Sequence, residues 1–163
     1  MAKARPIDGL HPDLPFATAA ALTVAVRADE LFAHAGGVLD TDDIARVHDM
    51  RVATRRLRAV LEIYAPCFPE AELKVALRGV KALADGLGAR RDPDVQLEDL
   101  ASFAEALTTD DAAGVDVFAD RLRAEQQDGN AILAAALEAA EAADLQGQLA
   151  ALVTAAHATV PVL

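Results

Sequence analysis

The sequence predicts an all-α protein that folds as an antiparallel helical bundle. Hydrophobic residues make up 53% of the 163 residues but aromatic residues only 4%, so Ala, Leu and Val must build the core, and these side chains suit closely packed helices. Apolar positions recur at helical spacing, and Gly, Pro and Asp stand where helices begin and end. No hairpin signal or internal repeat favours another class.

We expect helices, in chain order, over residues 15–35, 40–65, 70–87, 92–107 and 110–158, the last with interruptions near 128–130 and 146–147. Gly36 and Gly37 end the first helix, because glycine readily adopts the left-handed conformation that closes a helix. Asp40 or Thr41 caps the second helix, which Pro66 then ends.

The third helix is expected to end at Gly88. Asp92 followed by Pro93 is typical of the cap and first residue of a new helix, because proline lacks the N–H that is unused in a first turn. The sequence therefore predicts a break between residues 88 and 92.

A chain of 163 residues fits one domain. We expect residues 1–163 to form it, with a signature region at 40–95 and an acidic helical region at 96–163. Cys67 is the only cysteine, so no internal disulfide is expected. The N-terminal MAKARPIDGL lacks the apolar run of a signal peptide, and no apolar stretch reaches about 18 residues, so we expect a soluble cytoplasmic protein without a membrane span.

Charge is distributed unevenly along the chain. Residues 46–91 hold ten Lys and Arg against five Asp and Glu, although the whole chain has a net charge of −11. A basic island in an acidic protein indicates one local anion site, since general nucleic-acid or membrane binding usually goes with a basic domain.

The stretch VHDMRVATRRLR at 47–58 places this charge on one side of the second helix. At 100° per residue, one face carries His48, Arg51, Arg55 and Arg58, with Arg56 on the flank. Met50, Leu57 and Leu61 form the opposite, apolar face. In the third helix, Lys74, Arg78 and Lys81 repeat the cationic spacing, so two neighbouring helices can present two cationic stripes to one groove.

Two explanations of the stripes follow from the pattern. The acidic segment 92–144 could fold back and neutralise the arginines in surface ion pairs, which would make the protein a helical scaffold. Alternatively, the stripes bind an external polyanion, because guanidinium groups bind phosphate oxygens in bidentate geometry. No aromatic residue is interleaved with the arginines, which disfavours a single-stranded nucleic acid as that polyanion.

The run VHDMRVATRRLRAVLEIY, followed by LRGVKALADGLGARRDPDV, resembles the CHAD family, the conserved histidine α-helical domain. The resemblance covers residues 17–95 and rests on the long motif HxMRVxxRRLR. It implies an all-helical domain that binds inorganic polyphosphate through a basic groove, often in proteins associated with polyphosphate granules. The implied polyphosphate-binding residues are His48, Arg51, Arg55, Arg56, Arg58, Lys74, Arg78, Lys81, Arg90 and Arg91, with Asp92 as a supporting residue.

Three of these residues have alternative roles. His48 either donates to phosphate and becomes protonated on binding, or stays neutral and fixes Arg51 through a hydrogen bond. Asp92 is expected to cap its helix and orient Arg91. The side chain of Arg90 is either a phosphate contact or simply solvated.

The chain departs from the family pattern in its second half. Residues 92–163 hold fourteen Asp and Glu but only Arg121 and Arg123 as basic residues, so they cannot supply a second cationic wall. Three interpretations follow: the protein is a single-repeat member, with one four-helix-type unit and additional C-terminal helices, or it binds a shorter or weaker ligand, or the sequence is a fragment. For a single-repeat member, pairing of two chains about a two-fold axis would complete the groove.

We expect no catalytic site, metal site or cofactor. Glu70-Ala71-Glu72-Leu73-Lys74 resembles the ExExK signature of triphosphatase domains, but that motif requires a strand, and on a helix the two glutamates diverge by about 200°. They are expected to be ordinary acids of a first helical turn. No other paired carboxylates, phosphate loop or nucleophile with its base stands out.

Overall fold

The computed structural model describes residues 3–105 and 109–158 and confirms the all-α class, with helices and no strands in this part of the chain. The elements are α1 (Phe16–Ala33), α2 (Ile44–Ile63), the short 3₁₀ helix η1 (Ala65–Cys67), α3 (Glu70–Ala104), α4 (Thr109–Ala142) and α5 (Leu145–Ala158).

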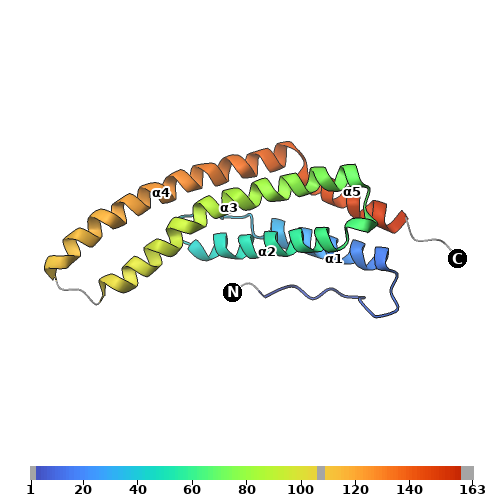
Figure 1. Ribbon diagram of the computed structural model, residues 1–163, viewed down its shortest axis with the longest axis horizontal. Coiled ribbons are helices and arrows are strands. Elements are labelled where there is room, and N and C mark those ends of the chain that lie inside the picture. Colours follow the sequence, from blue (N-terminus) through green and yellow to red (C-terminus); the bar gives the residue numbers. More distant parts are fainter. Residues whose placement is uncertain (1–2, 106–108, 159–163) are drawn as a thin grey trace.

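The two longest helices of the described chain, α3 and α4, run side by side as an antiparallel hairpin (Figure 1). Helices α1, α2 and α5 cover one half of this hairpin, and its other half extends past the start of α2 (Figure 1). Contacts join α1 to α2 and α5, and α2 to α3. The bundle therefore consists of a body, where α1, α2 and α5 pack on the hairpin, and an arm in which α3 and α4 project alone.

The core of the body is aliphatic, as the composition predicts. Leu31 of α1, Met50 and Leu57 of α2, Leu83 of α3 and Leu149 of α5 are buried in one cluster. Burial of these faces favours the bundle by about 25 cal/mol per Å² of apolar surface. Because the apolar face of α2 points into this cluster, its cationic face must point outward.

The predicted break between residues 88 and 92 is wrong: α3 is a single helix of 35 residues with Pro93 inside it. Proline cannot donate the usual backbone hydrogen bond to the carbonyl of Ala89. That carbonyl faces α4 at Gly129, where a β-carbon would stand 2.4 Å from the Ala89 oxygen. The close approach of α4 stabilises a continuous helix where the local sequence favours a break.

The predicted interruption near 128–130 is also wrong, because Gly129 lies inside the continuous α4 and serves this helix contact. The last break occurs slightly earlier than expected, between α4 and α5. There, Asp144 has a positive φ of 51°. Its carboxylate accepts a hydrogen bond from the N–H of Gly147 at 3.1 Å, so Asp144 caps α5.

The start of α2 differs from the expected cap at residue 40 or 41. The helix begins at Ile44, and Asp43 occupies the cap position, where its carboxylate accepts a hydrogen bond from Nε of Arg46 at 2.8 Å but none from a backbone N–H of the first turn. Asp40 instead accepts a hydrogen bond from the N–H of Asp42 at 3.0 Å and so closes the preceding turn. Helix α1 ends at Ala33 with His34 as its C-cap, slightly before the predicted end, and Gly37, with a φ of 72°, lies in the turn that follows.

Candidate anion-binding groove

The cationic face of α2 lies over a hollow between α2 and α3. Its volume is about 350 Å³, and the lining includes His48, Arg51, Arg55 and Arg56 of α2 together with Ala84 of α3. Arg51 and Arg55 are exposed, whereas His48 and Arg56 are half-buried. The helical spacing thus brings the predicted residues of α2 to one concave surface.

A second hollow continues along the same two helices. It has a volume of about 640 Å³, and Arg58 lines both hollows. Lys74, Arg78 and Lys81 line the second hollow from α3. We name the two hollows together the basic groove, lined by Arg51, Arg55, Arg58, Lys74, Arg78 and Lys81.

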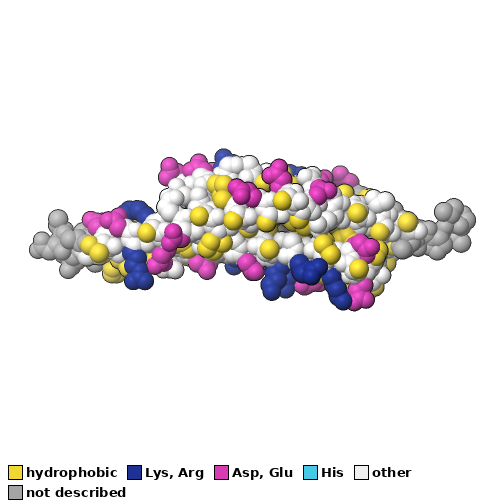
Figure 2. Space-filling model, turned by 90° about the horizontal axis from the view of Figure 1, so that it is seen from above, with side chains coloured by type: hydrophobic (Ala, Val, Ile, Leu, Met, Phe, Trp, Pro, Cys, Tyr) yellow, Lys and Arg dark blue, Asp and Glu magenta, His cyan; other side chains and the backbone are white. Residues whose placement is uncertain are grey.

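The charge pattern is visible on the surface. Figure 2 shows several Lys and Arg side chains close together on the lower edge of this view, with Asp and Glu side chains beside them and over the rest of the face. The linings of the two hollows show that cations of the basic island lie together in space.

Two cations of the basic groove have carboxylate partners on their own helices. Arg58 pairs with Glu62 one turn further along α2, with 2.8 Å between Nε and Oε1. Lys74 pairs with Glu70 in the first turn of α3. Glu70 and Glu72 are first-turn acids of this helix, as expected, so the ExExK motif is not on a strand.

The other four cations of the basic groove form no ion pair or hydrogen bond with another residue in the described part of the chain. They are Arg51, Arg55, Arg78 and Lys81. Four neighbouring positive charges therefore face solvent in a protein whose net charge is −11. The described residues of the acidic segment 92–144 form no ion pair with these four cations, although the scaffold explanation requires such pairs.

Arg51 reaches across to α3. A β-carbon at Gly88 would stand 3.2 Å from Nη1 of Arg51, so the absence of a side chain at residue 88 makes room for this guanidinium. Gly88 lies in the middle of α3 rather than at its end. The residue that was expected to stop a helix thus shapes one end of the basic groove.

Arg56 belongs partly to a buried cluster on the other flank of α2. Its Nη1 lies 3.4 Å from Oε1 of Glu30, a residue of α1 that is 1% exposed. Burial alone would raise the pKa of Glu30, but hydrogen bonds from the Arg27 side chain and the Arg5 backbone, together with the charges of Arg27 and Arg56, hold it below its ordinary value. Glu30 therefore stays charged and anchors Arg56.

Arg90 does not belong to the basic groove, and its prediction as a solvated residue or phosphate contact is wrong. It is fully buried and pairs with Asp94 one turn further along α3. Burial, followed by repulsion from Arg91, lowers the pKa of Arg90. Helix α3 turns this side chain toward α4, away from the face that carries Lys74 and Arg78.

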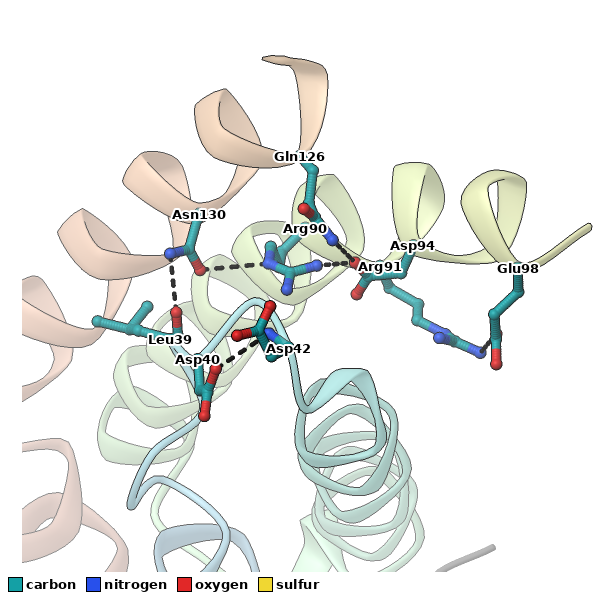
Figure 3. A network of polar contacts seen from close by, with 9 residues as sticks. All are labelled: Leu39, Asp40, Asp42, Arg90, Arg91, Asp94, Glu98, Gln126 and Asn130. Atoms are coloured by element: carbon teal, nitrogen blue, oxygen red, sulfur yellow. Dashed lines mark hydrogen bonds and ion pairs between the residues drawn. The ribbon is translucent and has the colours of Figure 1, made fainter. Parts of the chain in front are cut away.

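The Arg90–Asp94 pair is the centre of a polar network between α3, α4 and the loop before α2 (Figure 3). Gln126 donates to Oδ1 of Asp94 at 2.7 Å, and Arg90 Nε donates to Oδ1 of Asn130 at 3.2 Å. Asn130 in turn donates to the carbonyl of Leu39 at 2.9 Å. The network therefore holds the loop that leads into the cationic helix.

Sequence reasoning missed Asp94, Gln126 and Asn130. The signal for Asp94 is present in the quoted ARRDPDV, where Asp94 follows Arg90 at the i, i+4 spacing of a helical ion pair. The predicted break at Pro93 concealed it, because a break would have separated the two residues.

Arg91 and Asp92 line neither hollow of the basic groove. Nη2 of Arg91 is 3.4 Å from Oε2 of Glu98, and only 17% of the Arg91 side chain is exposed. Asp92 is exposed inside α3, so the predicted capping role is wrong.

Residues 3–105 and 109–158 contain no group of three or more His, Cys, Asp or Glu that could hold a metal ion. None of their helices is both long and apolar enough to cross a membrane.

Comparison with known proteins supports the sequence resemblance. The family of the CHAD domain matches residues 23–162. The match extends from α1 through α5, well past residues 17–95, on which the sequence motif rests. No curated protein and no solved structure matches the chain.

Proposed function

Because this chain belongs to the CHAD domain family, we propose that it binds inorganic polyphosphate in the basic groove between α2 and α3. CHAD domains are associated with polyphosphate-related proteins. The observation that carries the proposal is the set of four cations, Arg51, Arg55, Arg78 and Lys81, that have no carboxylate partner among the described residues.

The arrangement suits a chain of phosphates better than a single phosphate. Arg51 and Arg55 lie one helical turn apart, a rise of about 6 Å along α2, and each guanidinium can donate two hydrogen bonds to one phosphate group. Arg78 and Lys81 face the same groove from α3. Successive phosphates of a linear polyanion can therefore contact cations from both helices at once.

The cations of the basic groove repel one another, and relief of this repulsion favours the binding of a polyanion. Like charges at i, i+4 spacing destabilise a helix by about 0.2–0.5 kcal/mol per pair. A polyanion removes this repulsion and releases its own condensed counterions. His48 lines the same concave surface, and its donation of a hydrogen bond to phosphate remains a prediction.

A nucleic acid is the alternative polyanion. Its phosphates could contact the same cations, but the described residues that line the two hollows include no aromatic side chain on which bases could stack. We therefore propose binding of the phosphate chain alone. We further propose that the protein binds polyphosphate without hydrolysing it, that it is cytoplasmic, and that it associates with polyphosphate granules.

The test is calorimetric titration of the protein with long-chain polyphosphate. The variant Arg51→Ala/Arg55→Ala removes two groove cations, and Arg121→Ala/Arg123→Ala is its matched control, because it changes the net charge equally on the exposed face of α4. We expect the groove variant to lose at least tenfold in affinity and the control to bind within about twofold of wild type. Equal losses in both variants would overturn the proposal.

Two additions to this titration separate the remaining alternatives. Competition with single-stranded DNA as strong as that of polyphosphate would favour the nucleic-acid alternative. Light scattering during size-exclusion chromatography gives the mass of the complex. A mass of two chains per complex would support the predicted pairing of two basic grooves, and a mass of one chain would contradict it.

A further inference from the structure

A second concave site lies on the body of the bundle, where α1 and α4 end and α5 begins. It is a pocket of about 460 Å³. Met50, Leu83 and Leu145 line it, and all three are almost completely buried. Phe32 and Leu137 add further apolar walls. The volume is within the range of about 300–1,000 Å³ that is usual for small-molecule sites.

The mouth of this pocket is negatively charged. Glu141 and Asp144 line it and are exposed, and no lining residue is Lys or Arg. The carboxylate of Asp144 accepts a hydrogen bond from the N–H of Gly147, whereas the carboxylate of Glu141 forms no hydrogen bond or ion pair with any described residue.

The ends of α1 and α4 contribute negative potential at this pocket, whereas the start of α5 contributes positive potential, which Asp144 offsets as its cap. Helices α1 and α4 both end beside the pocket, and neither has a basic residue in its last turn. The end of a helix carries a partial negative charge from its free carbonyl groups, which favours a cation nearby. The Glu141 carboxylate and the ends of α1 and α4 thus act in the same direction at the mouth of an apolar cavity, against the partial positive charge at the start of α5.

We propose that this pocket binds a small amphiphilic cation, an aliphatic chain or ring that carries one primary ammonium group. The apolar part displaces water from the half-buried side chains of Phe32 and Leu137, and the ammonium group remains at the mouth beside Glu141. Met50 belongs to the buried floor of the pocket, where its flexible side chain adapts to different apolar shapes. This site shares no lining residue with the basic groove and does not depend on polyphosphate binding.

The test compares three probes with the same eight-carbon chain: octylammonium, octanol and octanoate, each kept below its micelle concentration. Occupancy is followed at the methyl group of Met50, because the chain has only two methionines and this signal is readily assigned. We expect octylammonium to shift the Met50 methyl signal in a saturable manner and to bind at least fivefold more tightly than octanol. No saturable shift, or equal affinity for octanol or octanoate, would overturn the proposal.

Variants of the pocket test the two parts of the site. Glu141→Gln removes the carboxylate at the mouth, and Glu138→Gln is its control, a residue of the same helix outside the pocket lining. We expect Glu141→Gln to weaken octylammonium binding about fivefold, as for a partly exposed charge pair, and Glu138→Gln to leave it unchanged. Ala35→Leu, which fills the pocket, should abolish the Met50 shift while circular dichroism remains that of the wild type. Equal binding by Glu141→Gln and Glu138→Gln, or a folded Ala35→Leu protein that still binds, would contradict the assignment.

Discussion

The guanidinium of Arg51 lies against Gly88, so close that a β-carbon at residue 88 would stand 3.2 Å from Nη1. This contact joins the cationic helix α2 to the middle of α3. A substitution at residue 88 can therefore change stability and binding in opposite directions. A methyl group added to a helix interior usually stabilises the helix, but at this position it would meet the Arg51 guanidinium.

Gly88→Ala should therefore raise stability while it weakens polyphosphate binding. Replacing glycine inside a helix contributes about 0.5–1 kcal/mol to the free energy of unfolding. The new methyl group displaces the Arg51 guanidinium, and we expect a threefold to tenfold loss of affinity, since a charged hydrogen bond is worth about 1.5–3 kcal/mol and is here shifted rather than removed. Urea denaturation and calorimetric titration measure the two effects.

The matched control for this change is Gly114→Ala in α4, where a β-carbon would meet no atom within 4 Å. It should stabilise the protein to a similar extent and leave polyphosphate affinity unchanged. Unchanged affinity in Gly88→Ala as well would show that the position of Arg51 does not matter for binding.

The two walls of the basic groove should contribute together to the salt dependence of binding. Removing Arg78 and Lys81 of α3 should weaken polyphosphate binding, as removal of the α2 arginines does, because all four cations face solvent without a carboxylate partner in the described structure. Between about 50 and 200 mM salt, the slope of log K against log salt should become shallower by about 1 for each cation that no longer neutralises a phosphate. If the variant without Arg78 and Lys81 has the same slope of log K against log salt as the wild type, the α3 side of the basic groove does not contact polyphosphate.

The buried pair of Arg90 and Asp94 should be a large contributor to stability. Asp94→Ala leaves the Arg90 charge buried without its carboxylate, and such changes cost about 3–5 kcal/mol of unfolding free energy. Asp92→Ala, two residues away and exposed, should change it by less than about 0.5 kcal/mol. Similar denaturation curves for the two variants would contradict the network described between α3 and α4.

The class of the fold, the first two helices and the two cationic stripes could be predicted from sequence, because each depends on a pattern within one helix. The continuity of α3 could not. Gly88 and Pro93 are local signals for a break, and the contact that overrides them comes from Gly129, which lies 36 residues beyond Pro93 in the sequence. The burial of Arg90 was missed for the same reason, since its partners Gln126 and Asn130 belong to α4.

The stability of the protein should depend on pH through Glu30. Its pKa is lower in the folded protein than its ordinary value of 4.5, so the unfolded chain takes up the proton first as the pH falls. The stabilisation by Glu30 is thus fully present above pH 4.5 and is lost as the pH falls through the lower, folded pKa. Glu30→Gln should therefore destabilise the protein at neutral pH and differ less from wild type in acid. A stability difference that does not change with pH would show that the Glu30 charge is not responsible.

Contact between polyphosphate and the cations of the basic groove is tested most directly by nuclear magnetic resonance of the arginine Nε–H groups. These signals are assigned with single Arg→Lys variants and followed during titration with long-chain polyphosphate. We expect the signals of Arg51, Arg55 and Arg78 to shift together and those of Arg121 and Arg123 on α4 to stay in place. Shifts confined to Arg121 and Arg123, or spread equally over all five arginines, would contradict the assignment of the site.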